Sequence, residues 1–171
     1  MTDESMRRYV FGAIVLILLI ATVAFAFRPA RAVPQPIAYP HKTHVTDNQM
    51  ECLSCHVNAD RSIAATIPSV TDCMVCHENV KTDSPEIKKL AAYAEKNEEP
   101  PWVRVYGFPV EADVYFSHKR HVKAGVDCST CHGDMKNMMT PIKENIHWTM
   151  GKCIDCHKEK QVSVDCLTCH K

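Results

Sequence analysis

One short pattern, C-x-x-C-H, contains every cysteine in this chain of 171 residues. An even number of cysteines in a small chain often predicts a disulfide framework, but the fixed spacing and the histidine after each pair argue against it. Five copies of one local site therefore constrain the fold more than any other feature. In chain order the motifs are 52–56, 73–77, 128–132, 153–157 and 166–170, and their cysteines are Cys52, Cys55, Cys73, Cys76, Cys128, Cys131, Cys153, Cys156, Cys166 and Cys169.

The C-x-x-C-H pattern is the attachment signature of c-type haem. Its two thiols add to the two vinyl groups of the porphyrin, and the histidine that follows is thereby brought to the iron as its proximal ligand. C-x-x-C alone also occurs in zinc sites and redox dithiols, but five copies with no cysteine left over favour five covalent haems c. The predicted proximal ligands are His56, His77, His132, His157 and His170.

The remaining five histidines equal the number of distal positions on five irons. They form two pairs with the same spacing, one in YPHKTHV and one in FSHKRHV, and a single residue in the second half of the chain. Side chains at i and i+3 of a helical turn share a face, so each pair is expected to reach two neighbouring haems. We predict that all five irons have two histidine ligands, and that the distal ones are His41, His44, His118, His121 and His147.

A methionine ligand or an open position at one iron is the alternative to five bis-histidine haems. Histidine–methionine ligation occurs in c-type cytochromes, where it raises the reduction potential. Which distal histidine serves which haem is left open by the spacing alone. The methionines in the relevant region are Met135, Met138, Met139 and Met150.

Residues 9–27, YVFGAIVLILLIATVAFAF, contain no charged side chain. A helix of this length spans roughly 28 Å, which matches the hydrocarbon core of a bilayer. We predict a retained single-pass anchor in the bacterial cytoplasmic membrane. A cleaved signal peptide is the alternative, because residues 24–26 and 30–32 resemble cleavage sites. Arginines flank the stretch on both sides and do not orient it.

Haem attachment supplies the predicted orientation, because c-type cytochromes mature on the outer side of the cytoplasmic membrane. Residues 1–8 are therefore expected in the cytoplasm, and residues 39–171 are expected to form a periplasmic pentahaem domain. The proline-rich segment 28–38 predicts an extended tether between the anchor and this domain.

The haem domain contains an internal repeat. Residues 39–77 and 116–157 share the order histidine pair, first motif, second motif, and the fifth motif at 166–170 follows. Between the repeats, SPEIKKLAAYAEKNEEPP predicts a helix capped by Ser84, and residues 102–116 are expected to be extended. Because strand patterns are scarce and loops are short, we predict a mostly α and irregular fold that wraps around five covalent haems.

The net charge disfavours nucleic acid as a partner, because 20 basic and 20 acidic residues cancel and no basic block occurs. Each haem would add two propionates. The loaded protein is therefore expected to be negative overall and to attract an electron acceptor with a basic surface.

The runs QPIAYPHKTHVTDNQMECLSCH, WVRVYGFPVEADVYFSHKRHV and HWTMGKCIDCH, in this order, resemble the pentahaem cytochrome of alternative complex III. The resemblance extends from Gln35 to Lys171. It implies an electron-transfer component, not itself an enzyme, of a quinol-oxidising respiratory complex. Its implied partners are an iron–sulfur protein, integral membrane quinol-binding subunits and a periplasmic electron acceptor.

Other functions remain open at this stage. Related hexahaem subunits belong to quinone reductase complexes that run electrons in the opposite direction, but this chain has five motifs. A stand-alone membrane-bound quinol dehydrogenase that feeds a periplasmic reductase would often need an atypical haem ligand. A multihaem nitrite reductase would be much longer and would use an open iron. Because five spare histidines match five distal positions, no open or atypical iron is expected, which disfavours both the stand-alone dehydrogenase and the nitrite reductase.

Overall fold

The structure is a computed structural model that describes residues 3–26, 32–108, 110–140, 142 and 146–170. Its contacts divide the chain into two compact units, Met1–Arg31 and Ala32–Lys171, and each is described by itself. Phe27, at the end of the predicted anchor, lies outside the described residues. So do residues 28–31 at the start of the predicted tether.

The first unit is one helix, α1 (Asp3–Ala26), and its part Met6–Phe25 is long and apolar enough to cross a membrane. A membrane anchor and a signal segment share these properties. Within this part, the hydroxyl of Thr22 donates to the carbonyls of Leu18 and Leu19 one turn earlier. The helix thus satisfies this polar group by itself, as an apolar surrounding requires.

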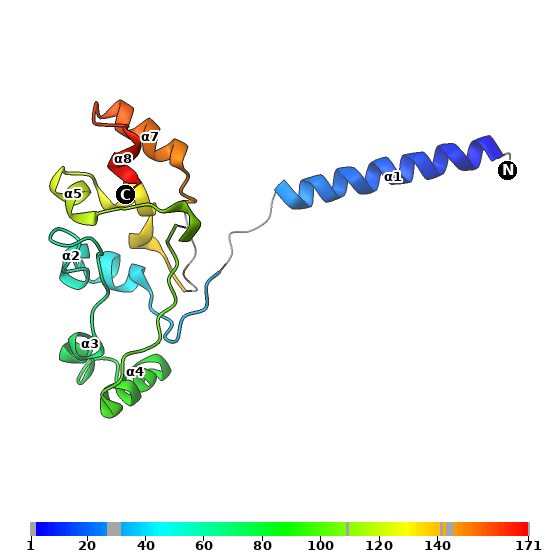
Figure 1. The fold of residues 1–171 in the computed structure, drawn as a ribbon. Helices are drawn as coiled ribbons and strands as arrows, with labels where there is room; N and C mark the ends of the chain where they lie inside the picture. Colours follow the sequence, from blue (N-terminus) through cyan, green and yellow to red (C-terminus); the bar gives the residue numbers. More distant parts are fainter. Residues whose placement is uncertain (1–2, 27–31, 109, 141, 143–145, 171) are drawn as a thin grey trace. The chain divides into compact units, whose positions relative to one another are not determined.

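The second unit is built from short helices joined by irregular segments, as the sequence predicted (Figure 1). Among its described residues there is no strand, and Val114 and His170 form an isolated bridge. The helical elements are η1 (Thr43–Asp47), α2 (Cys52–Cys55), α3 (Val70–His77), α4 (Pro85–Lys96), η2 (Val110–Ala112), α5 (His118–Lys123), α6 (Cys128–His132), η3 (Met135–Asn137), α7 (Met150–Glu159) and α8 (Cys166–Cys169).

Helix α4 packs on α3 and forms the apolar cluster of the second unit. Its N-cap is Ser84 and Pro85 occupies its first turn, in agreement with the sequence prediction, and Asn97 ends it in the left-handed conformation. Leu90 is buried there against Ile37 and Val70. In Figure 1, α3 and α4 lie at one end of the unit and α7 and α8 at the other, with α2 and α5 between them.

Four of the five helices that carry a C-x-x-C-H motif begin with a capping side chain. Ser69 and Asp72 form a reciprocal capping box at the start of α3. Asp127, Thr149 and Asp165 accept hydrogen bonds from backbone N–H groups at the starts of α6, α7 and α8. Such caps satisfy N–H groups that a short helix otherwise leaves unpaired, so these helices depend on them more than a long helix would.

We expect Ser69→Ala to lower the free energy of unfolding by about 1 kcal/mol, because it removes the capping box of α3. Ser84→Ala is the matched control, since the Ser84 hydroxyl makes no side-chain capping bond in α4. Denaturant unfolding of the haem-loaded protein, followed by circular dichroism, measures both variants. Equal losses in the two variants would contradict this role of Ser69.

Candidate haem-binding sites

The cysteine pairs lie on five short helices, so the two thiols of each motif, three residues apart, face the same side. None of the ten forms a disulfide. Burial raises the pKa of the Cys55, Cys131 and Cys153 thiols, whereas a reactive redox dithiol needs a lowered thiol pKa. The described residues also contain no cluster of three or more metal-binding side chains that would suit zinc.

The second histidine pair lies on helix α5, with one ring facing each of two proximal histidines. The ring centres of His118 and His132 are 6.3 Å apart and the rings are nearly parallel, at 7°. The ring centres of His121 and His157 are 6.1 Å apart, at 41°. The spacing of three residues therefore directs the two rings of this pair to two different motifs.

The first histidine pair has a corresponding arrangement. His41 lies in the helical turn that leads into η1, and His44 lies within η1. The ring centres of His44 and His77 are 6.1 Å apart, at 70°. The second histidine of each pair thus faces the proximal histidine of the second motif in its repeat.

These separations suit an iron between the two rings. Two metal–nitrogen bonds of about 2 Å, together with the distance from each nitrogen to its ring centre, put facing imidazole centres about 6 Å apart. Rings in direct stacking contact would lie closer. The three separations of 6.1–6.3 Å therefore fit histidine pairs that share an axial metal.

Backbone carbonyls hold most of these imidazoles by the Nδ1 atom. In the distal set, His44 and His121 each bond the carbonyl four residues earlier, at 3.0 and 2.9 Å. An Nδ1–H that donates to a carbonyl leaves Nε2 with its lone pair free, which is the state of a metal-bound histidine. The same contact, at 2.6–3.1 Å, is made by His56, His77, His118, His157 and His170.

Two other histidines are half-buried and favour the neutral ring. Burial and the nearby His56 ring lower the pKa of His41 to about 4. Burial and the nearby His118 ring lower the pKa of His132. At neutral pH both imidazoles are uncharged, which is the form that binds a metal. The Nδ1 atom of His41 is buried and has no hydrogen-bond partner among the described residues.

An aromatic ring orients each histidine pair, a role that the sequence analysis missed. Tyr39 meets His41 edge-on at 5.0 Å and stacks on His44 at 4.3 Å. Phe116 repeats this, with 4.9 Å to His118 and 4.5 Å to His121. The signal was present in the repeat, because each aromatic residue stands two positions before the first histidine of its pair.

The second unit buries few apolar side chains, which fits a fold whose interior is completed by a large bound cofactor. Among the described residues, the buried apolar side chains are Ile37, Ala59, Val70, Leu90 and Pro100. A domain of this size ordinarily buries well over half of the surface of its unfolded chain. Porphyrins between the short helices would supply the missing apolar interior, so the residues present fit covalent haem.

The fifth distal candidate, His147, is exposed, and its carbonyl accepts a hydrogen bond from Lys152 at 2.8 Å. The methionines considered as alternative ligands are dispersed. Met139 and Met150 are 52% and 67% exposed, and the sulfur of Met135 lies 3.9 Å from the hydroxyl oxygen of Tyr106.

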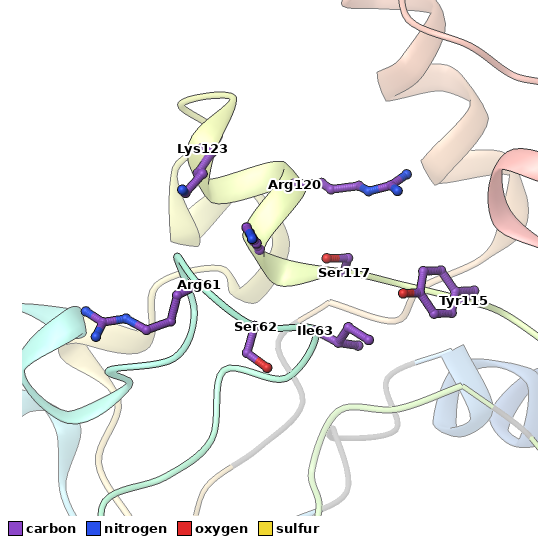
Figure 2. A pocket seen from close by; sticks show the side chains of 8 residues that line it. Arg61, Ser62, Ile63, Tyr115, Ser117, Arg120 and Lys123 are labelled. Carbon is purple, nitrogen blue, oxygen red and sulfur yellow. The ribbon is translucent and has the colours of Figure 1, made fainter.

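A basic pocket of about 630 Å³ lies beside the second histidine pair. Figure 2 shows that one part of its wall comes from residues 61–63 and the other from residues before and within α5. Ser117, at the base of α5, is buried. The cationic side chains that line the pocket are Arg61, Lys119, Arg120 and Lys123.

Known proteins match this description. The sequence profile of a family described as cytochrome c7 and related cytochrome c matches residues 114–171. A menaquinone reductase multihaem cytochrome c subunit from Nitratidesulfovibrio vulgaris strain Hildenborough is 30% identical in an alignment 164 positions long, and the alignment covers 80% of this chain and 77% of the relative. The chain therefore belongs to the multihaem cytochrome c family.

Replacing Phe116 by leucine is expected to loosen both rings on α5. The imidazole planes would rotate, so the electron paramagnetic resonance signals of two low-spin haems should change, and stability should fall by about 1 kcal/mol or more. Tyr39→Phe, which keeps the corresponding ring in the first pair, is the control and should leave the spectrum unaltered. An unchanged spectrum in Phe116→Leu would contradict the orienting role.

Proposed function

We propose that this chain is a membrane-anchored pentahaem cytochrome c that transfers electrons at the periplasmic face of a quinone-linked respiratory complex. The observation that carries the proposal is the set of three histidine pairs whose ring centres are 6.1–6.3 Å apart. An electron carrier needs closed, six-coordinate irons, whereas catalysis at iron needs an open position. In this assignment the protein supplies ligands, spacing and electrostatics.

The geometry supports specific ligand pairs. His118 would be the distal partner of His132, and His121 that of His157. In the first repeat, His44 would be the partner of His77. By the repeat, His41 would be the distal partner of His56, which is one of the nearby rings that, after burial, lower the pKa of His41. His147 is then left for His170.

When bound, c-type haem supplies one-electron redox chemistry. The contribution of this chain would be to hold neutral imidazoles in fixed orientations. The carbonyl of Ser117 and the ring of Phe116 restrain His121 from two directions. Rigid ligands reduce the reorganisation that accompanies a change of charge at iron, which suits rapid electron transfer.

Two directions of electron flow are candidates. The resemblance to alternative complex III and the presence of five motifs favour quinol oxidation, with electrons leaving to a periplasmic acceptor. The similarity to a menaquinone reductase subunit favours the opposite direction as a second candidate. In both, the partners would be iron–sulfur and integral membrane quinone-binding subunits, and α1 would anchor this chain in the lipid.

We expect His121→Met to change a single haem. A methionine that binds iron in place of histidine raises the reduction potential, and one that fails to bind leaves a high-spin iron. Redox titration and electron paramagnetic resonance of the full-length protein distinguish the two cases. Lys123→Met on the same helix is the control. The assignment of His121 would be wrong if the variant kept five unchanged haems.

Anaerobic mixing of the assembled complex with menaquinol tests the function itself. Rapid haem reduction, followed by reoxidation with a soluble cytochrome, is expected for quinol oxidation. Haem reduction by a soluble cytochrome, followed by oxidation with menaquinone, would establish the reverse direction. Exchange of electrons with neither menaquinol nor menaquinone would refute a quinone-linked role.

With this chain alone, haem reduction by menaquinol should be slow, because the quinone site would lie in the partner subunits. Fast reduction of the isolated chain would favour a stand-alone quinol dehydrogenase.

A further inference from the structure

Each histidine pair joins two neighbouring motifs. On α5, His118 faces the third motif and His121 faces the fourth. In the first repeat, His44 faces the second motif, and the ring of Tyr39 contacts both His44 and His41. These contacts place the third motif beside the fourth. Burial and the nearby Cys55 of the first motif raise the pKa of Cys73 in the second, which places the first motif beside the second.

The two repeats meet at the first and third motifs. The backbone N–H and the Nδ1 atom of His118 both bond the carbonyl of Ile63, at 3.0 and 2.9 Å, and the N–H of Lys119 bonds the carbonyl of Ser62 at 3.0 Å. Figure 2 shows the same junction as the wall of the basic pocket.

Further contacts strengthen this junction. The backbone N–H of Lys42 bonds the carbonyl of Met138 at 3.1 Å, which ties the first histidine pair to the segment after the third motif. The Cys52 and Cys128 thiols of the two motifs also interact: burial and the nearby Cys52 raise the pKa of Cys128.

The fifth motif lies beside the fourth. The Nδ1 atom of His157 lies 2.7 Å from the carbonyl of Ser163, whose hydroxyl lies 3.0 Å from that of Thr168 within α8. The N–H of Tyr115 donates to the carbonyl of Cys169 at 2.7 Å, so α8 also closes onto the segment before α5.

We infer that the five motifs form one unbranched row in the order second, first, third, fourth, fifth, which differs from their order in the chain. The inference rests on the proposed haem ligation. Figure 1 agrees with the two ends of this order: α3 lies at one end of the unit, α7 and α8 lie together at the other, and α2 and the histidine-bearing α5 lie between them.

The row has two ends, at the second and fifth motifs. Each of these two motifs has one strongly exposed apolar side chain between its cysteines, Val75 at 76% and Leu167 at 73%, whereas Leu53 of the first motif is 42% exposed. Electrons would therefore enter and leave at the second and fifth motifs, with the junction between the repeats in the middle of the path.

The order is tested by proton nuclear magnetic resonance of the full-length, fully reduced protein in detergent micelles. Reduced low-spin haems are diamagnetic, so nuclear Overhauser contacts between the substituents of different haems report which haems are neighbours. We expect four neighbouring pairs, with one neighbour for each of two haems. The methionine signals in His41→Met, His44→Met, His118→Met and His121→Met would label the first, second, third and fourth haems in turn.

The second haem should contact one other haem and the fourth should contact two. A second haem with two neighbours, a closed or branched pattern, or no contact between the haems of the first and third motifs would overturn the order. If the variants fail to mature, the wild-type pattern alone still decides between a row and any other arrangement. The haem content and the ligand-field spectrum of the same sample are measured first. If they disagree with five bis-histidine haems, the proposed ligation is wrong. If they agree, an unexpected pattern of neighbours rejects the order alone.

Discussion

The separation between facing imidazoles is the constraint on which the account depends. A histidine three residues from another on a short helix projects in nearly the same direction, so one helical turn can serve two metals but not both sides of one. In α5 this turn is held by the carbonyl of Ile63, the carbonyl of Ser117 and the ring of Phe116. The local geometry of one turn thereby links two motifs that are separated by about twenty residues of chain.

A second consequence concerns stability. The apolar cluster formed by α3 and α4 is the main buried contact among the described residues, and the rest of the second unit is built from short capped helices and backbone hydrogen bonds. Helices of four to ten residues are not stable by themselves in water. Covalent attachment of haem would both cross-link the chain and fill its interior, so folding and cofactor insertion are expected to be one process.

The sequence predicted the helical and irregular fold, helix α4 and the membership of the multihaem cytochrome c family, because each depends on local pattern. It did not reveal the ring contacts of Tyr39 and Phe116 or the facing rings of His44 and His77, because these depend on the folded positions of the segments. The inferred order of the motifs was likewise hidden, since it rests on neighbours such as Cys52 and Cys128 that are far apart in the chain. The resemblance to alternative complex III names a finer class than the similarity to known proteins, which shows a multihaem cytochrome c with a relative in a menaquinone reductase.

The most direct test of the central claim is the low-temperature electron paramagnetic resonance spectrum of the fully oxidised, full-length protein, with the haem content measured on the same sample. The account predicts five haems per chain and low-spin signals from all of them, because every iron has two histidine ligands. A high-spin signal equivalent to one haem per chain would show that one iron is open. It would contradict the account of this chain as a closed electron carrier.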